Sequence, residues 1–254
     1  MTIQRLNMDN TWHIELDGLR LLTDPWLEGE EIDFFPWFNK QWHRTKPAAY
    51  SAVPAYDVVL ITQKYPDHFH PVTLQKLQPK KLIVPHTIAS KVQKLLPAAE
   101  VIAMGKQQST YNLQGINFTW LPTRRPIDPI YDAVYVKGKT EALFIASHGF
   151  EIDEKHLAAI DKQMPIKLLI SPYNLYQLPA LLGGTVSPGL KGLQHLNGVL
   201  HPQHIVATHD EDKHAEGLVT KFAMVVRIGK QDLKDYPDLY SKALDAEHYN
   251  VISL

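Results

Sequence analysis

The sequence predicts a mixed α/β fold that spans residues 1–254 as a single domain. A chain of 254 residues is long enough for one large α/β domain with a buried core. Its 44% apolar and 21% charged residues are ordinary values for a globular protein. Short apolar strands alternate with segments of helical spacing along most of the chain, and no linker or repeat interrupts them.

Composition narrows the possible partners. A net charge of -1 provides no general attraction to nucleic acid or to an anionic membrane. Because the chain has no cysteine, disulfides, thiolate ligands and a thiol nucleophile are excluded, and a metal would need His, Asp, Glu or water. The N-terminal residues lack the apolar core of a signal peptide, and no apolar run approaches the length of a membrane span. We expect a cytoplasmic protein.

The first third of the chain combines a clear hairpin with an irregular segment. Residues 11–17 and 19–23 read as two strands around Asp17-Gly18, a dipeptide typical of type I′ turns. Residues 28–54 are rich in aromatic residues and proline, and we expect a long loop there. Whether this loop covers a functional site or only the core stays open.

A polar loop in the middle of the sequence is the leading candidate for a functional site. Residues 57–62 form an apolar strand, and the loop after it holds Asp67, His68 and His70 before a helix begins at Pro71. A carboxylate and two imidazoles in one loop are typical of a metal site or an acid–base site.

The remaining elements continue the alternation of strands and helices. We expect strands at 81–84, 100–104, 111–112, 115–121, 133–137, 142–146, 167–170 and 204–208. We expect helices at 87–96, 153–163, 190–200 and 213–226. Residues 173–188 read as irregular, and the tail from Asp232 as partly helical.

Three of the expected strands end in comparable polar segments. The loop with Asp67 and His68 follows one strand, Ser147-His148 follows a second, and His209 follows a third. In layered α/β folds such strand ends lie along one rim, so these side chains could meet. Imidazoles and carboxylates gathered there would suit zinc, manganese or iron.

The spacing Thr62-x-x-x-x-Asp67-His68 resembles the T-H-x-H-x-D-H loop of the metallo-β-lactamase superfamily. Residues 17–27 are similar to the opening hairpin of its sugar-lactone-hydrolase-like members, and the later strand ends fall in the same order. The resemblance therefore covers nearly the whole chain, and is greatest to a divergent branch with a Gln-x-x-x-Asp-His-x-His loop. It implies a four-layer αββα sandwich with the site at one edge between two sheets.

The chain departs from the superfamily at the positions of the first metal site. The first two histidine ligands fall on Gln63 and Tyr65, and neither is a good zinc ligand. The third is expected after Trp120, where residues 121–126 contain no histidine. The bridging aspartate falls on Ser147. The site that needs three histidines is thus lost.

The second metal site is better preserved. The resemblance assigns Asp67, His68 and His209 as ligands, with His148 close enough in motif order to join or replace one of them. Such a set leaves a position open for water, as in catalytic zinc sites. It implies one divalent ion, zinc first and manganese or iron as alternatives, or no ion at all. Asp67 or a neighbouring histidine such as His148 would take the proton during catalysis.

Four further residues are candidates for binding the substrate, each with a plainer alternative. Gln63 and Tyr65 would face substrate in the vacated pocket, or only pack there. Arg124 would bind an anionic group, or lie solvated on the surface. His70 would contact substrate, or cap the helix that begins after it. Asp24 could support a ligand from behind, or only end its strand.

These residues favour a metal-dependent hydrolase of a small-molecule ester, lactone, amide or phosphoester. A metal-free descendant that binds a ligand or a protein is the alternative, since the three-histidine site is absent. An iron oxidoreductase ranks last because the bridging aspartate is missing. Fold alone does not decide among these functions.

Overall fold

The computed structural model describes the chain except for residues 106–108, 124–131, 183, 211–212 and 247–248. Contacts divide the chain into two compact units. Unit 1 comprises Met1–Ser109, Asp212–Thr220 and Ala246–Leu254, and unit 2 comprises Thr110–Glu211 and Lys221–Asp245. That the whole chain is one domain stays a prediction.

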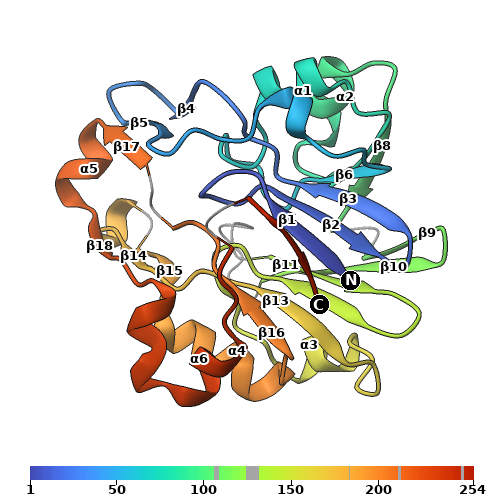
Figure 1. The fold of residues 1–254 in the computed structure, drawn as a ribbon. Helices are drawn as coiled ribbons and strands as arrows, with labels where there is room; N and C mark the ends of the chain where they lie inside the picture. Colours follow the sequence, from blue (N-terminus) through green and yellow to red (C-terminus); the bar gives the residue numbers. More distant parts are fainter. Residues whose placement is uncertain (106–108, 124–131, 183, 211–212, 247–248) are drawn as a thin grey trace. The chain divides into compact units, whose positions relative to one another are not determined.

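Unit 1 is built on a mixed seven-stranded sheet of order β19-β1-β2-β3-β6-β7-β8 (Figure 1). Its strands are β1 (Thr2–Arg5), β2 (Trp12–Leu16), β3 (Leu19–Thr23), β6 (Val58–Leu60), β7 (Lys81–Pro85), β8 (Glu100–Met104) and β19 (Val251–Ser253). The pairs from β19 to β3 are antiparallel, and those from β3 to β8 are parallel. The expected hairpin is confirmed, with φ of 50° at Asp17 and 86° at Gly18, as a type I′ turn requires.

Two helices cover one face of this sheet. They are α1 (Pro71–Leu77) and α2 (Ala89–Leu95). Leu74 of α1 and Val92 of α2 are fully buried and belong to one apolar cluster with Val59, Leu82 and Val84 of the sheet. Burial of side chains of this size stabilises the fold by about 1.5–3 kcal/mol each. The sheet therefore holds the loop before α1 in a defined position.

The expectation of a loop over residues 28–54 is wrong in part. Strands β4 (Glu30–Asp33) and β5 (Asn39–His43) form an antiparallel hairpin, and η1 (Tyr50–Ala52) is a short 3-10 helix. A third strand, β17 (Lys213–Glu216), pairs with β5. The three strands are mostly polar, so no apolar alternation marked them in the sequence.

The helix expected over residues 213–226 is also wrong. That segment contains β17, a short helix α5 (Leu218–Phe222) and strand β18 (Met224–Val226). Gly217 separates the first two, with a φ of 112° that a side chain rarely adopts. A Cβ atom there would lie 2.6 Å from the carbonyl oxygen of Phe38. The close approach of β17 to the β4–β5 hairpin therefore requires a glycine that also ends the strand.

Unit 2 is built on a six-stranded sheet of order β16-β13-β12-β11-β10-β9. Its strands are β9 (Thr110–Leu113), β10 (Ile116–Leu121), β11 (Ala133–Lys137), β12 (Ala142–Ile145), β13 (Ile166–Ile170) and β16 (His204–Val206). Pairs from β9 to β12 are antiparallel, whereas β12, β13 and β16 run parallel. Helices α3 (Glu154–Ala158), α4 (Leu190–Leu200) and α6 (Pro237–Lys242) and the 3-10 helix η4 (Lys230–Asp235) contribute side chains to one core cluster with it.

A small second sheet completes unit 2. It has the order β15-β14-β18, with β14 (Leu175–Gln177) and β15 (Thr185–Pro188) joined through the 3-10 helix η3 (Ala180–Leu182). The irregular segment expected at 173–188 is thus a hairpin, and its pairing shifts register between Tyr176 and Gln177. This irregularity explains why periodicity did not reveal it.

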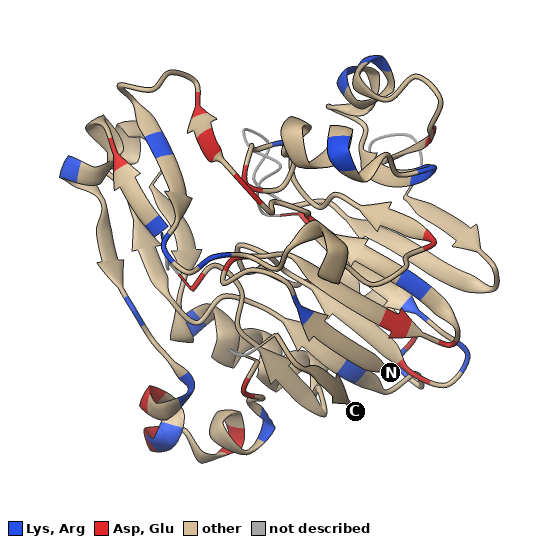
Figure 2. Ribbon diagram, turned by 45° about the horizontal axis from the view of Figure 1, so that its top comes forward, with Lys and Arg blue, Asp and Glu red and all other residues tan. Residues whose placement is uncertain are grey.

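The distribution of charged residues and the length of the helices concern two predictions, that the protein binds neither nucleic acid nor a membrane. Figure 2 shows Lys and Arg interspersed with Asp and Glu in both units. Among the described residues, no helix is long and apolar enough to cross a membrane. That the protein avoids nucleic acid stays a prediction.

His43 on β5 is a half-buried imidazole whose protonation would oppose folding of unit 1. Its ring lies 3.8 Å from the Trp26 ring between centroids, and its Nε2 lies 3.1 Å from the Trp26 carbonyl oxygen, which can only accept. Burial is the main cause that lowers the pKa of His43 to about 4, although the Asp9 carboxylate opposes it.

We predict that His43→Gln makes stability less sensitive to acid. The unfolded histidine protonates near its usual pKa of about 6.5, while the folded one stays neutral down to about pH 4. Between these values the unfolded state binds more protons, so stability falls as the pH falls. Urea unfolding at pH 7.5 and pH 5 should show a smaller loss in the variant. An equal loss in both proteins would refute this role of His43.

Candidate metal centre

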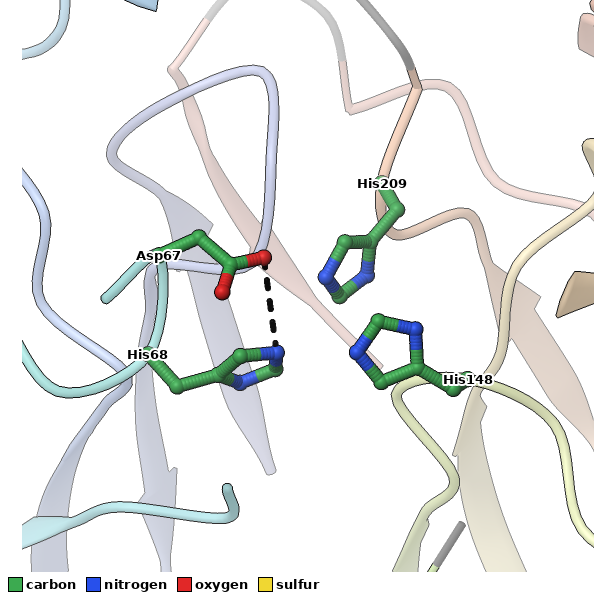
Figure 3. A group of neighbouring side chains, drawn as sticks. All are labelled: Asp67, His68, His148 and His209. Atoms are coloured by element: carbon green, nitrogen blue, oxygen red, sulfur yellow. Dashed lines mark ion pairs between the residues drawn. The ribbon is translucent and has the colours of Figure 1, made fainter. Parts of the chain in front are cut away.

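The loop between β6 and α1 presents Asp67 and His68 side by side in unit 1. The N–H groups of His68 and Phe69 both donate to the carbonyl oxygen of Tyr65, at 3.0 and 2.7 Å, and this closes a tight turn. His68 Nε2 lies 3.7 Å from Asp67 Oδ2 (Figure 3). The His68 side chain is fully buried, whereas Asp67 is partly exposed. A polar side chain buried this completely needs fixed partners.

Asp24 orients the His68 ring through a contact with its Nδ1 atom. His68 Nδ1 lies 3.0 Å from Asp24 Oδ2 and 3.1 Å from the Thr62 hydroxyl oxygen. Asp24 also accepts hydrogen bonds from the N–H of Thr62 at 2.7 Å and from its hydroxyl at 2.6 Å. A carboxylate beside Nδ1 favours a proton on that nitrogen and leaves Nε2 as the atom that can bind a metal. Asp24 therefore does more than end its strand.

The surroundings of His68 stabilise positive charge. Burial by itself lowers the pKa of the imidazole, but the carboxylates of Asp67 and Asp24 outweigh it and raise the pKa of His68 above 6.5. The same field would favour a bound metal cation at this position.

Sequence reasoning missed two acidic residues on β4 that act on the same loop. Burial, together with the charge of Asp67, raises the pKa of Asp33 to about 6, and Asn39 donates a hydrogen bond to its carboxylate at 2.9 Å. Burial also raises the pKa of Glu31, with further contributions from Asp33 and Asp67. The only sequence signal was two acidic residues in a segment read as loop.

His148 lies in a tight turn after β12 in unit 2. The N–H of Gly149 donates to the carbonyl oxygen of Ala146 at 2.8 Å, and the His148 side chain is buried. Gly149 has a φ of 78°, and a Cβ atom there would lie 2.7 Å from the ring of Pro188. Only glycine fits this position, so the turn fixes the backbone on which His148 is placed.

His209 follows β16 with a left-handed φ of 53°, which is uncommon outside glycine. The side chain of Asn174 donates to the His209 carbonyl oxygen at 2.9 Å and accepts from the N–H of Ile228 at 2.6 Å. The rings of His148 and His209 lie 4.4 Å apart between centroids (Figure 3). Sequence reasoning found both histidines but not Asn174, which is an asparagine in a segment read as irregular.

The predicted substrate-binding residues have different positions. Gln63 is buried, and Tyr65 is partly exposed with the Lys64 ammonium 5.0 Å from its ring centroid. His70 caps α1, because its Nδ1 accepts from the N–H of Thr73 at 3.3 Å. Contact of Gln63 and Tyr65 with substrate stays a prediction, and Arg124 lies outside the described residues.

The donor groups within each unit are of types that bind divalent metal ions. Asp67, His68, His148 and His209 each offer one ligand atom, a carboxylate oxygen or an imidazole nitrogen. These ligand types suit zinc, manganese and iron. Histidines that bind a metal commonly have a hydrogen-bonding partner at the other ring nitrogen, as His68 has.

Comparison with known proteins identifies a protein family whose model matches this chain. The model of a family described as the Beta-lactamase superfamily domain matches residues 6–209. A search of curated protein sequences finds no match to this chain.

Several solved structures share the fold over nearly their whole length. A possible metal-dependent hydrolase from Veillonella parvula has a TM-score of 0.70 and 15% identity, with 100% of this chain and 99% of that chain covered. An isothiocyanate hydrolase from Delia radicum gut bacteria has a TM-score of 0.67 and 15% identity, with 100% of this chain and 99% of that chain covered. Igni18, a metallo hydrolase from Ignicoccus hospitalis, has a TM-score of 0.65 and 14% identity, with 99% of this chain and 98% of that chain covered.

At these identities the structures are evidence for the fold, and the family match is evidence for the family. The predicted fold class, an α/β protein of the four-layer αββα metallo-β-lactamase type, is confirmed. The chain belongs to the metallo-β-lactamase superfamily.

Proposed function

We propose that this protein is a metal-dependent hydrolase with one divalent ion, zinc first and manganese or iron as alternatives. Asp67 and His68 of unit 1 and His148 and His209 of unit 2 would hold it. The observation that carries the proposal is the buried His68 ring, whose Nδ1 lies 3.0 Å from the Asp24 carboxylate. A carboxylate beside the ring nitrogen that does not bind the metal is typical of metal-binding histidines.

The substrate would be a small-molecule ester, lactone, amide or phosphoester. A divalent ion at this position would activate water and polarise the bond to be cleaved. Asp67 has two carboxylate oxygens and is partly exposed, so one oxygen can bind the ion while the other accepts a proton.

The residues at the other family positions support a single ion. Gln63 and Tyr65 replace the first two histidines, and Leu121, Pro122 and Thr123 include none. Amide and phenol side chains are poor zinc ligands. A second ion would therefore lack the ligands that the superfamily provides for it.

The same departures favour the second candidate, a metal-free descendant that binds a ligand or another protein. The two functions differ in one property, the binding of a metal, so metal analysis separates them. We propose a cytoplasmic protein in either case.

We predict about one zinc, manganese or iron per chain in the purified, untagged protein. His68→Ala and His209→Ala should each lose it, because each removes an imidazole that the ion needs. Elemental analysis of folded protein, with folding checked by circular dichroism, measures this.

His156→Ala is the matched control. His156 is a buried histidine whose Nε2 lies 2.9 Å from the Pro122 carbonyl oxygen, and this variant should retain the metal. Wild-type protein that holds no metal after reconstitution would contradict the hydrolase proposal and favour the metal-free function. If metal is present, a panel of esters, lactones, amides and phosphoesters tests the reaction.

We predict that Asp24→Asn weakens metal binding by roughly 10–100-fold, the usual effect of losing such a supporting group. The asparagine amide would favour the other tautomer of His68 and place a proton on Nε2. Competition titration with a chromophoric chelator measures the affinity. Asp57→Asn, which removes a carboxylate paired with Arg20 at 2.7 Å in the same unit, should leave it unchanged. Equal affinities in wild type and Asp24→Asn would contradict this role.

A further inference from the structure

A cavity of about 470 Å³ lies within unit 2 beside His148, and we call it the α4 pocket. Its volume falls in the range of about 300–1,000 Å³ that is usual for small-molecule sites. Its wall comes from the turn after β12, the β14–β15 hairpin and the first turns of α4. Because His148 is one of the proposed metal ligands, a molecule in the pocket would lie next to the reacting centre.

The wall of the α4 pocket is largely apolar and closely packed. Phe150, Leu175 and Pro188 are apolar residues of this wall. The Pro188 ring packs against two glycines, Gly149 and Gly192, and a Cβ atom at either would collide with it. The shape of the pocket wall therefore depends on two positions without side chains, which let the Pro188 ring pack closely against the backbone.

The polar groups of the wall do not favour an anion. Among the described residues that line the pocket, the charged side chains are Lys191 and Glu151, which have opposite signs. Thr123 and Thr185 add hydroxyl groups, which can donate a hydrogen bond to a carbonyl oxygen. Binding of a phosphate group typically uses several cationic or N–H donors. One lysine opposed by one glutamate is a poor match for it.

We propose that the α4 pocket binds the apolar acyl or aryl part of an uncharged substrate, which selects esters, lactones or amides over phosphoesters. This inference rests on the proposed function for the reaction, but the binding itself needs no metal. The apolar wall supplies affinity through burial, and the threonine hydroxyls orient the polar group toward His148.

Two fluorescent probes with the same aromatic body test the proposal. N-phenyl-1-naphthylamine is uncharged, and 8-anilinonaphthalene-1-sulfonate adds a sulfonate. Both are titrated into the full-length protein as purified and after treatment with a chelator. We expect the uncharged probe to bind one site per chain, at least about tenfold more tightly than the sulfonate, in both preparations.

Variants locate the probe. Gly192→Leu should weaken binding of the uncharged probe by about tenfold or more, because its Cβ atom would collide with the Pro188 ring and displace the wall of the pocket. Gly198→Leu is the matched control on the same helix, since a Cβ atom there meets nothing within 4 Å. His195→Trp at the exposed rim is the second variant, with exposed Gln194→Trp as its control.

The outcomes separate this inference from the proposed function. Absence of binding by the uncharged probe, tighter binding of the sulfonate, or binding unaffected by both Gly192→Leu and His195→Trp would overturn the inference. Those results leave the metal content unchanged. Absence of metal with the expected probe binding would overturn the hydrolase proposal instead.

Discussion

The contact between the Asp24 carboxylate and the His68 ring is the interaction on which the candidate site depends. Their side chains are 1% and 0% exposed, so water can solvate neither of them. Removing one partner of such a buried pair commonly costs about 3–5 kcal/mol, because the other is left uncompensated. Thr62 reinforces the pair by donating twice to Asp24. The arrangement is stable as a unit and fixes which nitrogen of His68 can bind a cation.

Strand direction explains why these residues occur where they do. Strands β3 and β6 are parallel with Thr23 opposite Leu60, and the Asp24 N–H donates to the Leu60 carbonyl oxygen at 2.9 Å. The residues that follow the two strands therefore lie at the same edge of the unit 1 sheet. In unit 2 the parallel strands β12, β13 and β16 bring the turn of His148 and the backbone of His209 to one edge in the same way. Carboxyl ends of parallel strands are the usual location of sites in α/β folds.

Much of the fold and of the candidate site could be predicted from the sequence. The strands and residues that were missed were missed for physical reasons. Apolar runs such as Val58–Leu60 and the Asp17-Gly18 turn carry strong local signals, and the resemblance around Asp67 and His68 added the superfamily. Strands β4 and β17 were missed because polar edge strands form through pairing between distant segments, which leaves no periodic pattern. Asp24 was left undecided and Asn174 was not recognised, because their roles depend on partners far away in the sequence. Long-range hydrogen bonds of this kind cannot be read from spacing.

The central claim is that two residue pairs, one from each unit, bind the same ion. Anomalous X-ray diffraction at the zinc absorption edge, from crystals of the zinc-loaded protein, tests it most directly. We predict one peak per chain, bonded at about 2.0–2.2 Å to a carboxylate oxygen of Asp67 and to ring nitrogens of His68, His148 and His209. A peak held by only one of the pairs, a second peak, or no peak under zinc saturation would contradict the claim.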